Sequence, residues 1–519
     1  MTGPALTALA VVALSAAPAW GQQPIELADD PARNTWETAE PTPPDADDGF
    51  RFLGLVQARY NLTNIVPTSP YLDGQVVGVL GGTNGTEVSA EERSRFGEYR
   101  TVGFFNYAPP TFGGRGELTA AFEVDFSFGD QSYLVRGNTG GAFGGDQVNL
   151  QTRRLHSTFR PALGGGHSLD IVVGLQFLAD GAYNPATATP DDLFRGGGGL
   201  KFFGSEAAGV SAYGGWGDSF QQRLRYRLGA YTLYEQGTAI EDDVTLVMVD
   251  AEIAPAYGLQ LGLHGWLLRD NGDGGGSVFG SGPSSALAEL QGAARLDFRP
   301  SEGAEAPVVD ADLIWLLADA GYNRALTTGP VGVTAFAAAN LGKLYVEEQV
   351  DPDVRGFATG GELRVRYAPG AGSIARVEGL FTSPNGPEED VYSGVITGNS
   401  YGIVGAVWAT HGAVLLFPDV QGINRHVGVV YDVSNKGEGL VGTSGSVGYD
   451  IIPNKLTASA GYAWGSTPSG GSLGTEVNGR LIAHPWFLFD VGLVGARVAG
   501  SPLEEDPWAV YTYLSWVVF

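Results

Sequence analysis

The stretch RLRYRLGAYTLY, which runs from Arg223 to Tyr234, alternates between two kinds of side chain. Its first half places arginine at every second position: Arg223, Arg225 and Arg227. The residues between them are apolar or aromatic, and the alternation continues to the end of the stretch. Successive side chains of a β-strand point to opposite faces, so this order predicts a strand with one charged face and one apolar face.

The same period of two returns along most of the chain after residue 49. Segments with clear alternation are 50–60, 117–128, 169–177, 286–299, 357–367 and 474–484. Many of them are close in length to the ~9–11 residues that a tilted strand needs to cross a bilayer. Their apolar rows often end in Phe or Tyr, which is typical of the aromatic girdles at the two interfaces of a membrane barrel.

The connections between these segments differ in length in a regular way. Short ones, such as 161–167 and 451–455, alternate with long Gly/Asp-rich ones, such as 129–147, 270–285 and 383–400. Short turns on one side of the membrane and long loops on the other are the arrangement of an outer-membrane-type barrel. A soluble β-sandwich also shows alternation. The segment lengths, the loop lengths and the aromatic row ends together favour the barrel.

These features predict an all-β fold, namely a transmembrane antiparallel β-barrel over residues 49–519 with short periplasmic turns and long extracellular loops. The sheet must close, because hydrocarbon offers backbone N–H and C=O groups no partner. We expect about 18 strands, with about 16–20 left open. The count depends on whether the weaker alternation at 331–342, 401–417 and 439–451 is included. A barrel of that size is too wide for side chains to fill and encloses water.

The composition excludes several classes of protein. The mean hydropathy is −0.01, and no apolar run reaches the ~18 residues that a spanning helix needs. The formal net charge of −27 repels a phosphate backbone, so we expect no nucleic-acid partner. Cysteine is absent, which removes disulfide frameworks and zinc–thiolate sites.

The first 48 residues form two segments ahead of the predicted barrel. Ala5–Leu14 is apolar and Ser15–Gly21 is rich in small residues, which predicts a secretory signal peptide over 1–21. No Lys or Arg precedes the apolar core, so a buried N-terminal helix stays an alternative. Residues 22–48 are acidic and Pro-rich, and we expect a disordered lead-in. The lead-in is too short for the plug of a TonB-type active transporter.

The chain ends in AVYTYLSWVVF, with Tyr511, Tyr513, Val517 and Phe519 on one face. This segment resembles the closing strand of Gram-negative outer-membrane β-barrel proteins, which end in Phe and carry aromatic or apolar residues at alternating earlier positions. The resemblance implies a porin-like protein of the outer membrane, in contact with lipid and lipopolysaccharide. It also implies recognition of Phe519 by the outer-membrane assembly machinery, and it leaves a homotrimer open.

Two neighbouring segments, 149–161 and 168–185, are similar in character to paired strands of porin-like families, including the alginate-export type. Barrels of that type use an Arg-lined tunnel to pass an acidic polysaccharide. The resemblance covers only these two segments and has no residue-by-residue motif, so no functional position follows from it.

If the apolar face of each strand meets lipid, its charged face must line the lumen. The expected pore-lining residues are Arg51, Arg59, Glu123, Asp125, Arg223, Arg225, Arg227, Arg295, Glu362, Arg364, Arg366, Arg376 and Glu378. Rings of charged side chains are how such pores select solutes. Two roles stay open for each arginine, namely bracing of the wall by pairing with an acid and contact with an anionic solute. The triplet at 223–227 has no acid on its own strand, so its charge must be balanced by neighbouring strands or by solute.

We expect no catalytic, metal or cofactor site. The six His residues are scattered and show no paired metal-ligand spacing. Two G-x-S-x-G matches, at 398–402 and 470–474, lack the strand-to-helix context of a nucleophile elbow. The acidic run 270–275 lacks the full spacing of a calcium loop and is interpreted as a polar surface loop.

The resulting hypothesis is an outer-membrane porin for passive diffusion of polar or anionic solutes through an Arg-containing lumen. The expected partners are small polar solutes, outer-membrane lipid and lipopolysaccharide. The first alternative is a structural or envelope-complex barrel whose pore is occluded by loops. The second, ranked lower, is an outer-membrane barrel enzyme.

Overall fold

A computed structural model describes most of the predicted barrel. The described residues are 49–64, 85–88, 93–129, 131–134, 148–179, 199–200, 204–216, 224–234, 243–272, 309–324, 326, 328–397, 408–419, 429–430, 433–486, 488–501 and 505–518. The expected signal peptide (1–21), the lead-in (22–48) and the predicted strand 286–299 lie outside them.

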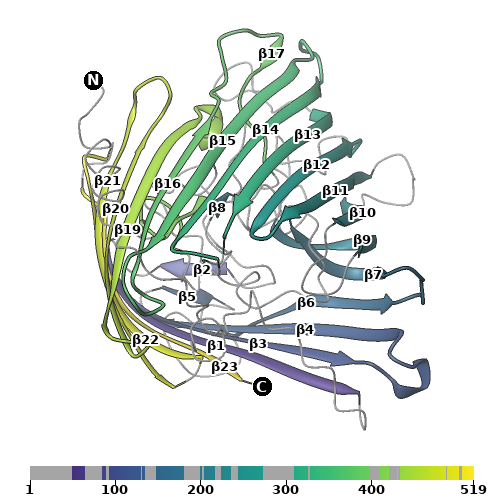
Figure 1. The fold of residues 1–519 in the computed structure, drawn as a ribbon. Helices are drawn as coiled ribbons and strands as arrows, with labels where there is room; N and C mark the ends of the chain where they lie inside the picture. The colour runs from purple at the N-terminus through teal and green to yellow at the C-terminus, as the bar shows by residue number, and fades with distance from the viewer. Residues whose placement is uncertain are drawn as a thin grey trace.

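The described residues form a closed antiparallel barrel of eighteen long strands (Figure 1). The wall strands, in chain order, are β1 (Phe50–Thr63), β3 (Ser94–Tyr107), β4 (Gly116–Gly129), β6 (Val148–Phe159), β7 (His167–Ala179), β9 (Gly204–Trp216), β10 (Leu224–Tyr234), β11 (Val244–Ala256), β12 (Leu259–Asp270), β13 (Val309–Tyr322), β14 (Val331–Val346), β15 (Asp353–Arg366), β16 (Ile374–Thr382), β19 (Leu440–Ile452), β20 (Leu456–Ser466), β21 (Ser472–Trp486), β22 (Phe489–Ala499) and β23 (Trp508–Val518). Each pairs with the wall strand before it and the wall strand after it. The expected fold class and strand number are confirmed.

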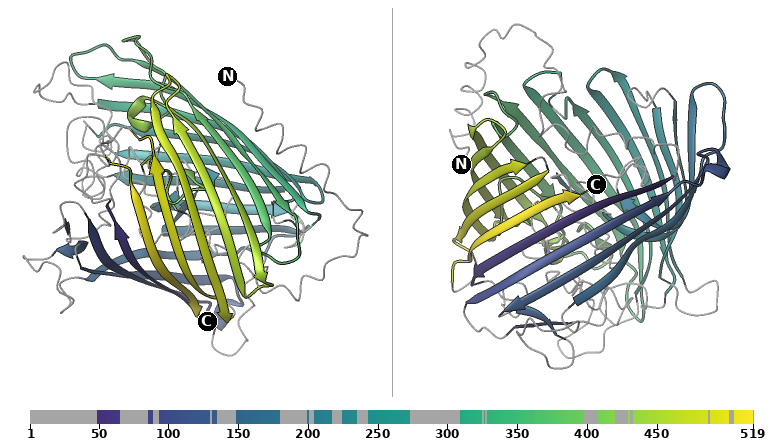
Figure 2. Two further views of the ribbon diagram at one scale, coloured as in Figure 1. Left: turned by 90° about the vertical axis from the view of Figure 1, so that its left-hand side faces the viewer. Right: turned by 90° about the horizontal axis from the view of Figure 1, so that it is seen from below.

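The first and last strands close the ring. β1 pairs with β3 along its whole length, and with β23 from Gly54↔Val518 to Thr63↔Ala509. Figure 2 shows the strands tilted relative to the axis of the barrel, as closure of a sheet requires. Closure gives the wall strands backbone partners on both sides, which the interior of a bilayer demands.

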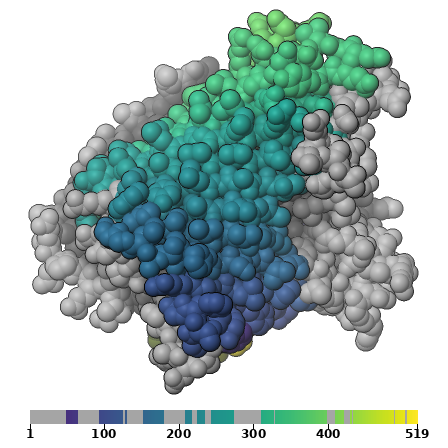
Figure 3. Space-filling view, turned by 90° about the vertical axis from the view of Figure 1, so that its right-hand side faces the viewer, coloured from purple at the N-terminus to yellow at the C-terminus, as the bar shows by residue number. Residues whose placement is uncertain are grey.

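Alternating burial along each strand separates an outer face from an inner face. In β11, Leu246 and Met248 are fully buried, whereas the adjacent Val247 and Val249 are 43% and 50% exposed. Large exposed apolar side chains occur on wall strands all around the ring, among them Phe52, Leu155, Val210, Leu263, Leu316, Leu363, Val477 and Leu493. Figure 3 shows the outer face of the blue and teal strands as a continuous surface. Such an apolar belt on a closed barrel fits hydrocarbon, and the fold is that of a transmembrane barrel.

The two ends of the barrel differ in the length of their connections, as predicted. At one end, two residues join β11 to β12 and three residues join β19 to β20. At the other end, residues 383–439 separate β16 from β19. We refer to 383–439 as the inward loop, because its described residues 413–417 pack against the inner face of the barrel.

The remaining described elements are short. β2 (Gly85–Val88) pairs with β5 (Gln131–Leu134), β8 (Gly199–Leu200) pairs with β18 (Trp408–Ala409), and β17 (Val391–Tyr392) runs parallel to the start of β15. Two 3-10 turns are η3 (Pro110–Phe112) and η8 (Asn435–Gly437). No helix in the described part of the chain is long and apolar enough to cross a membrane.

The last strand places its aromatic row on the inside of the barrel. Tyr511, Tyr513 and Val517 are buried, whereas Val510 and Trp516 are 44% and 45% exposed on the outer face. The three residues share one face, as the sequence predicts. Phe519 lies outside the described residues.

The three weakly alternating stretches divide between the wall and the inward loop. Residues 331–342 lie in β14, and 440–451 lie in β19. The described residues of that third stretch, 408–417, belong to the inward loop instead, and among them only Trp408 and Ala409 are strand. Its run of apolar residues packs inside the barrel and adds no strand to the wall.

Candidate functional site

The inward loop carries an apolar tip that packs against the inner face of the barrel. Val414, Leu415, Leu416 and Phe417 have at most 2% of their surface exposed. They share a buried cluster with wall residues of β16, β19, β20, β22 and β23, namely Leu380, Leu440, Ala463, Val494, Ala496, Val498, Ala509, Tyr511 and Tyr513. The loop also returns on itself, because the N–H groups of residues 429 and 430 donate to the carbonyls of residues 415 and 416. The tip is therefore a packed structure held inside the lumen.

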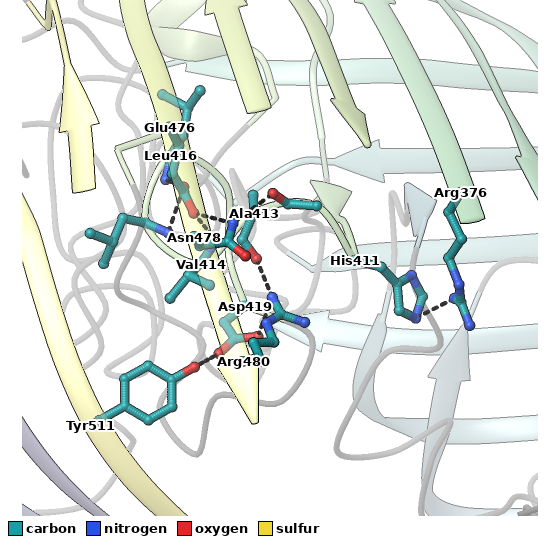
Figure 4. Close-up of polar contacts among 12 residues, drawn as sticks. Arg376, His411, Ala413, Val414, Leu416, Asp419, Glu476, Asn478, Arg480 and Tyr511 are labelled. Carbon is teal, nitrogen blue, oxygen red and sulfur yellow. Dashed lines mark hydrogen bonds and ion pairs between the residues drawn. The ribbon is translucent and has the colours of Figure 1, made fainter. Parts of the chain in front are cut away.

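Glu476 of β21 fastens this tip by accepting hydrogen bonds from its backbone. Its Oε1 accepts from the N–H of Val414 at 2.7 Å, and its Oε2 accepts from the N–H groups of Leu415 and Leu416 at 2.9 and 2.6 Å. Asn478 donates to Oε1 at 2.8 Å. Glu476 has no exposed surface, so a carboxylate of the wall is enclosed by donors (Figure 4).

A second fastening joins the loop to β21 and β23. Arg480 donates from Nη2 to the carbonyl of Ala413 at 2.7 Å, and the same nitrogen lies 3.4 Å from Oδ1 of Asp419. The hydroxyl of Tyr511 donates to Oδ2 of Asp419. Asn478 also donates to the carbonyl of Gly412 at 2.8 Å. Figure 4 shows these side chains converging on the loop from the wall.

His411 provides a third fastening, to β16. Its Nε2 lies 2.5 Å from Nη1 of Arg376, and its backbone N–H donates to Oε2 of Glu378 at 3.1 Å. A guanidinium only donates, so Nε2 must accept and the ring proton sits on Nδ1, which faces Oε1 of Glu378 at 3.5 Å. Enclosure between loop and wall, reinforced by the charge of Arg376, lowers the pKa of His411 well below its usual 6.5.

Glu362, Glu378 and His411 bring three potential metal donors within 4.8 Å of one another. The neighbouring guanidinium groups already occupy these potential ligand atoms. Nε of Arg364 lies 2.6 Å from Oε1 of Glu362, and Nη1 of Arg376 donates to Nε2 of His411. A metal on Nδ1 would move the ring proton to Nε2, against a donor of Arg376. The arrangement therefore fits an ion-pair network better than a cation site.

The N-terminal part of the inward loop is fastened to a different region of the wall. The N–H of Ile396 donates to Oδ1 of Asn340 at 3.0 Å, and Trp315 donates from Nε1 to the carbonyl of Ile396 at 2.9 Å. Tyr392, Val395 and Ile396 are buried with side chains of β11–β15. The described parts of the loop thus contact two separate apolar clusters on the inner face of the barrel.

A chain of charged residues crosses four neighbouring strands on the inner face. Arg227 of β10 lies 2.6 Å from Asp250 of β11, and His264 of β12 lies between Asp250 (2.8 Å) and Asp319 of β13 (2.7 Å). Arg324, just after β13, pairs with Asp319 at 2.6 Å. Two positions away in the register of β10 and β11, Arg225 pairs with Glu252. Two arginines of the opening stretch therefore find their counter-charges on the next strand.

The wall formed by β1, β3, β4 and β6 is richer in arginine. Glu123 is fully buried and pairs with Arg100 at 2.9 Å and with Arg153 at 2.5 Å. The register shifts on β6 where Ala121 opposes Arg154 and the next residue of β4 opposes residue 152. This bulge turns both Arg153 and Arg154 inward.

Two arginines of this wall stack on aromatic rings. The guanidinium of Arg154 lies over the rings of Phe104 and Phe177, at 5.8 and 5.1 Å. That of Arg59 lies 3.4 Å from the centre of the Tyr511 ring. Contacts of this kind hold a cation in a fixed direction without removing its charge.

The structure places most of the predicted pore-lining residues on the inner face. Those on inward positions of the described strands are Arg51, Arg59, Glu123, Arg225, Arg227, Glu362, Arg364, Arg366, Arg376 and Glu378. Arg223, Arg295 and the side chain of Asp125 lie outside the described residues. Sequence reasoning missed Arg100, Arg153 and Arg154. Arg100 shares its face with Glu98, which is the one local signal for it, whereas the bulge hides the orientation of the other two.

Among the comparisons with known proteins, matches were found with solved structures. No family model and no curated protein matches the sequence. Solved structures that match include OccAB4 of Acinetobacter baumannii (9% identity, 91% of this chain and 99% of that chain, TM-score 0.42), OccK8 (OprE) of Pseudomonas aeruginosa (10%, 90% and 98%, 0.43) and a BenF-like porin from Pseudomonas fluorescens (10%, 91% and 98%, 0.42). These are outer-membrane porins of Gram-negative bacteria.

Proposed function

We propose that this protein is a porin of the outer membrane of a Gram-negative bacterium, through which polar solutes, and anionic solutes in particular, diffuse passively. The observation that carries the proposal is a closed barrel of eighteen strands with an apolar outer belt and a charged inner face. A barrel of that size is wider than its wall side chains can fill. No bond is made or broken in this role.

An excess of arginine on one side of the lumen supports the preference for anions. On β1, β3, β4 and β6, five arginines and two glutamates of the described residues point inward, namely Arg51, Arg59, Arg100, Arg153, Arg154, Glu98 and Glu123. This count leaves out Glu117 and Arg160, which pair with each other at the short-turn end. Positive charge in a tube with low-dielectric walls raises the local concentration of anions. Charged rings are a general means of selection in pores.

The inward loop supports a selective channel over a wide-open one. Its tip occupies space beside β16 and β19–β23 and is held there by Glu476, Arg480 and Arg376. A solute must then pass the loop on its way through the lumen. The fastenings set the width of that passage.

A barrel whose pore is occluded by loops is a second candidate. The observation that favours it is the burial of the loop tip in a wall cluster, together with the meeting of two loops at the β8–β18 pair. Such a protein would serve the envelope as a structural element. It would carry no ionic current.

Purified protein in a planar bilayer distinguishes the two candidates. The porin proposal expects discrete steps of ionic current and, in a salt gradient, a reversal potential on the anion-selective side. A bilayer that stays silent at protein levels where reconstitution is verified would favour the occluded barrel. Cation selectivity would contradict the role given to the arginine-rich wall.

The same proposal names the expected partners. They are outer-membrane lipid, lipopolysaccharide, the assembly machinery through Phe519, and further copies of the chain in a homotrimer. Removal of Phe519 should reduce insertion into the outer membrane while total synthesis stays constant. Native mass measurement in detergent distinguishes a trimer from a monomer.

A further inference from the structure

Three consecutive backbone N–H groups of the inward loop converge on one carboxylate. Those of Val414, Leu415 and Leu416 reach Glu476 at 2.7, 2.9 and 2.6 Å. Successive backbone N–H groups that point to one side form concavities suited to anions. The loop therefore carries an anion-binding concavity. The anion in it is the carboxylate of Glu476, about sixty positions further along the chain.

The distribution of the donors matches a carboxylate and not a single-centre anion. Val414 and the side chain of Asn478 share Oε1, whereas Leu415 and Leu416 share Oε2. All four groups donate, which suits the ionised form of Glu476 because that form only accepts. Hydrogen bonds to an ionised acceptor are about twice as strong as neutral ones.

We propose that residues 414–416 form a carboxylate-binding site, that Glu476 is its built-in occupant, and that occupancy of the site holds the inward loop in the lumen. The loop supplies the recognition and the wall supplies the ligand, so an exogenous small carboxylate can take the place of the Glu476 side chain once that side chain is removed. The link to solute passage rests on the proposed channel function. The binding itself does not.

The chain offers a cavity of defined size for the test. Glu476→Ala removes Cγ, Cδ and both carboxylate oxygens, and acetate has the same four heavy atoms. Arg480, which donates to the carbonyl of Ala413, keeps a positive charge close to the vacated position. Glu476→Gln is the matched variant, because it fills the same space but leaves only one accepting oxygen.

Hydrogen–deuterium exchange measures the protection of the backbone N–H groups of 414–416 directly. The peptide covering 408–419 is followed by mass spectrometry on the full-length protein in detergent. In Glu476→Ala we expect exchange at least tenfold faster than in the wild type. Added acetate should restore protection in a saturable way, and chloride at equal ionic strength should not. Glu476→Gln should also exchange faster but gain nothing from acetate, because its side chain still occupies the site.

The control variant is Glu252→Ala, which removes a lumen carboxylate that pairs with Arg225. It should show wild-type exchange at 408–419 and no response to acetate. Unchanged exchange in both Glu476 variants, or equal effects of acetate and chloride in Glu476→Ala, would overturn the proposal. If Glu476→Ala fails to form a heat-modifiable barrel, Glu476→Gln alone tests the fastening, and wild-type exchange in that variant overturns it.

Conductance of the same variants separates this inference from the proposed function. A porin with a released loop should pass larger current steps in Glu476→Ala, and acetate should reduce them. Acetate-dependent protection in a protein that never conducts would leave the carboxylate site standing and overturn the channel. Conduction without acetate-dependent protection would leave the channel standing and overturn the carboxylate site.

Discussion

Arg227 and Asp250 face each other across β10 and β11, with Nε and Oδ2 2.6 Å apart and neither side chain exposed to solvent. The next inward pair on the same strands, Arg225 and Glu252, has the same chemistry with side chains 40% and 20% exposed. Asp250 also accepts from Trp266 at 2.9 Å and contacts His264. Burial therefore separates two ion pairs that look alike in the sequence.

This difference predicts unequal effects on stability. Arg227→Ala leaves a buried carboxylate without its main counter-charge and should destabilise the barrel by ~3–5 kcal/mol. Arg225→Ala breaks a partly exposed pair and should change the stability by ~0–1 kcal/mol. Urea unfolding in detergent, followed by tryptophan fluorescence, measures both variants. Equal losses would show that the buried pair has no special weight.

Selectivity should depend more on Arg59 than on Arg225. Arg59 is stacked on Tyr511 and has no ion pair with an acid in the described part of the chain, whereas the charge of Arg225 is balanced by Glu252. Arg59→Ala should shift the reversal potential in a salt gradient toward cations, and Arg225→Ala should shift it less. A larger shift for Arg225→Ala would place the selective charge on the other side of the lumen.

The third fastening predicts a dependence of the inward loop on pH. The pKa of His411 in the docked loop lies well below 6.5, because the ring is enclosed and faces Arg376. A released loop would restore the usual value. The released form then binds protons more readily, so docking is strongest above about pH 6.5 and weakens as the pH falls below it.

The groups that act on His411 come from three wall strands. Arg376 and Glu378 lie on β16, Glu362 and Arg364 on β15, and Arg480 on β21. Exchange of 408–419 should rise on acidification from pH 7.5 to about pH 5. His411→Gln should remove most of that rise, while His484→Gln, at the short-turn end of the barrel, should leave it unchanged. A rise that persists in His411→Gln would assign the effect to the carboxylates.

Much of the wall could be predicted because a strand with unlike faces needs only its own residues to be recognised. The alternation at 117–128 and 357–367 matches β4 and β15. The count of eighteen followed from such segments and from the preference of bacterial barrels for even numbers. The inward orientation of Arg225 and Arg227 followed from the same rule.

The features that the sequence did not predict depend on contacts between distant segments. The apolar residues of 408–417 resemble a weak wall strand, and only packing against β19–β23 makes them a loop tip. Glu476 gives no local sign that it will meet backbone N–H groups about sixty residues away. The partners of Arg225 and Arg227 depend on strand register, although the matching spacing of Asp250 and Glu252 was a usable signal.

The central claim, a water-filled passage narrowed by the inward loop, is tested most directly by single-channel current in a planar bilayer. The comparison is between the wild type and a variant in which 386–436 is replaced by a short Gly–Ser turn. We expect discrete steps in the wild type and larger steps in the variant. Silence from both proteins after verified insertion, or identical step sizes, would contradict it.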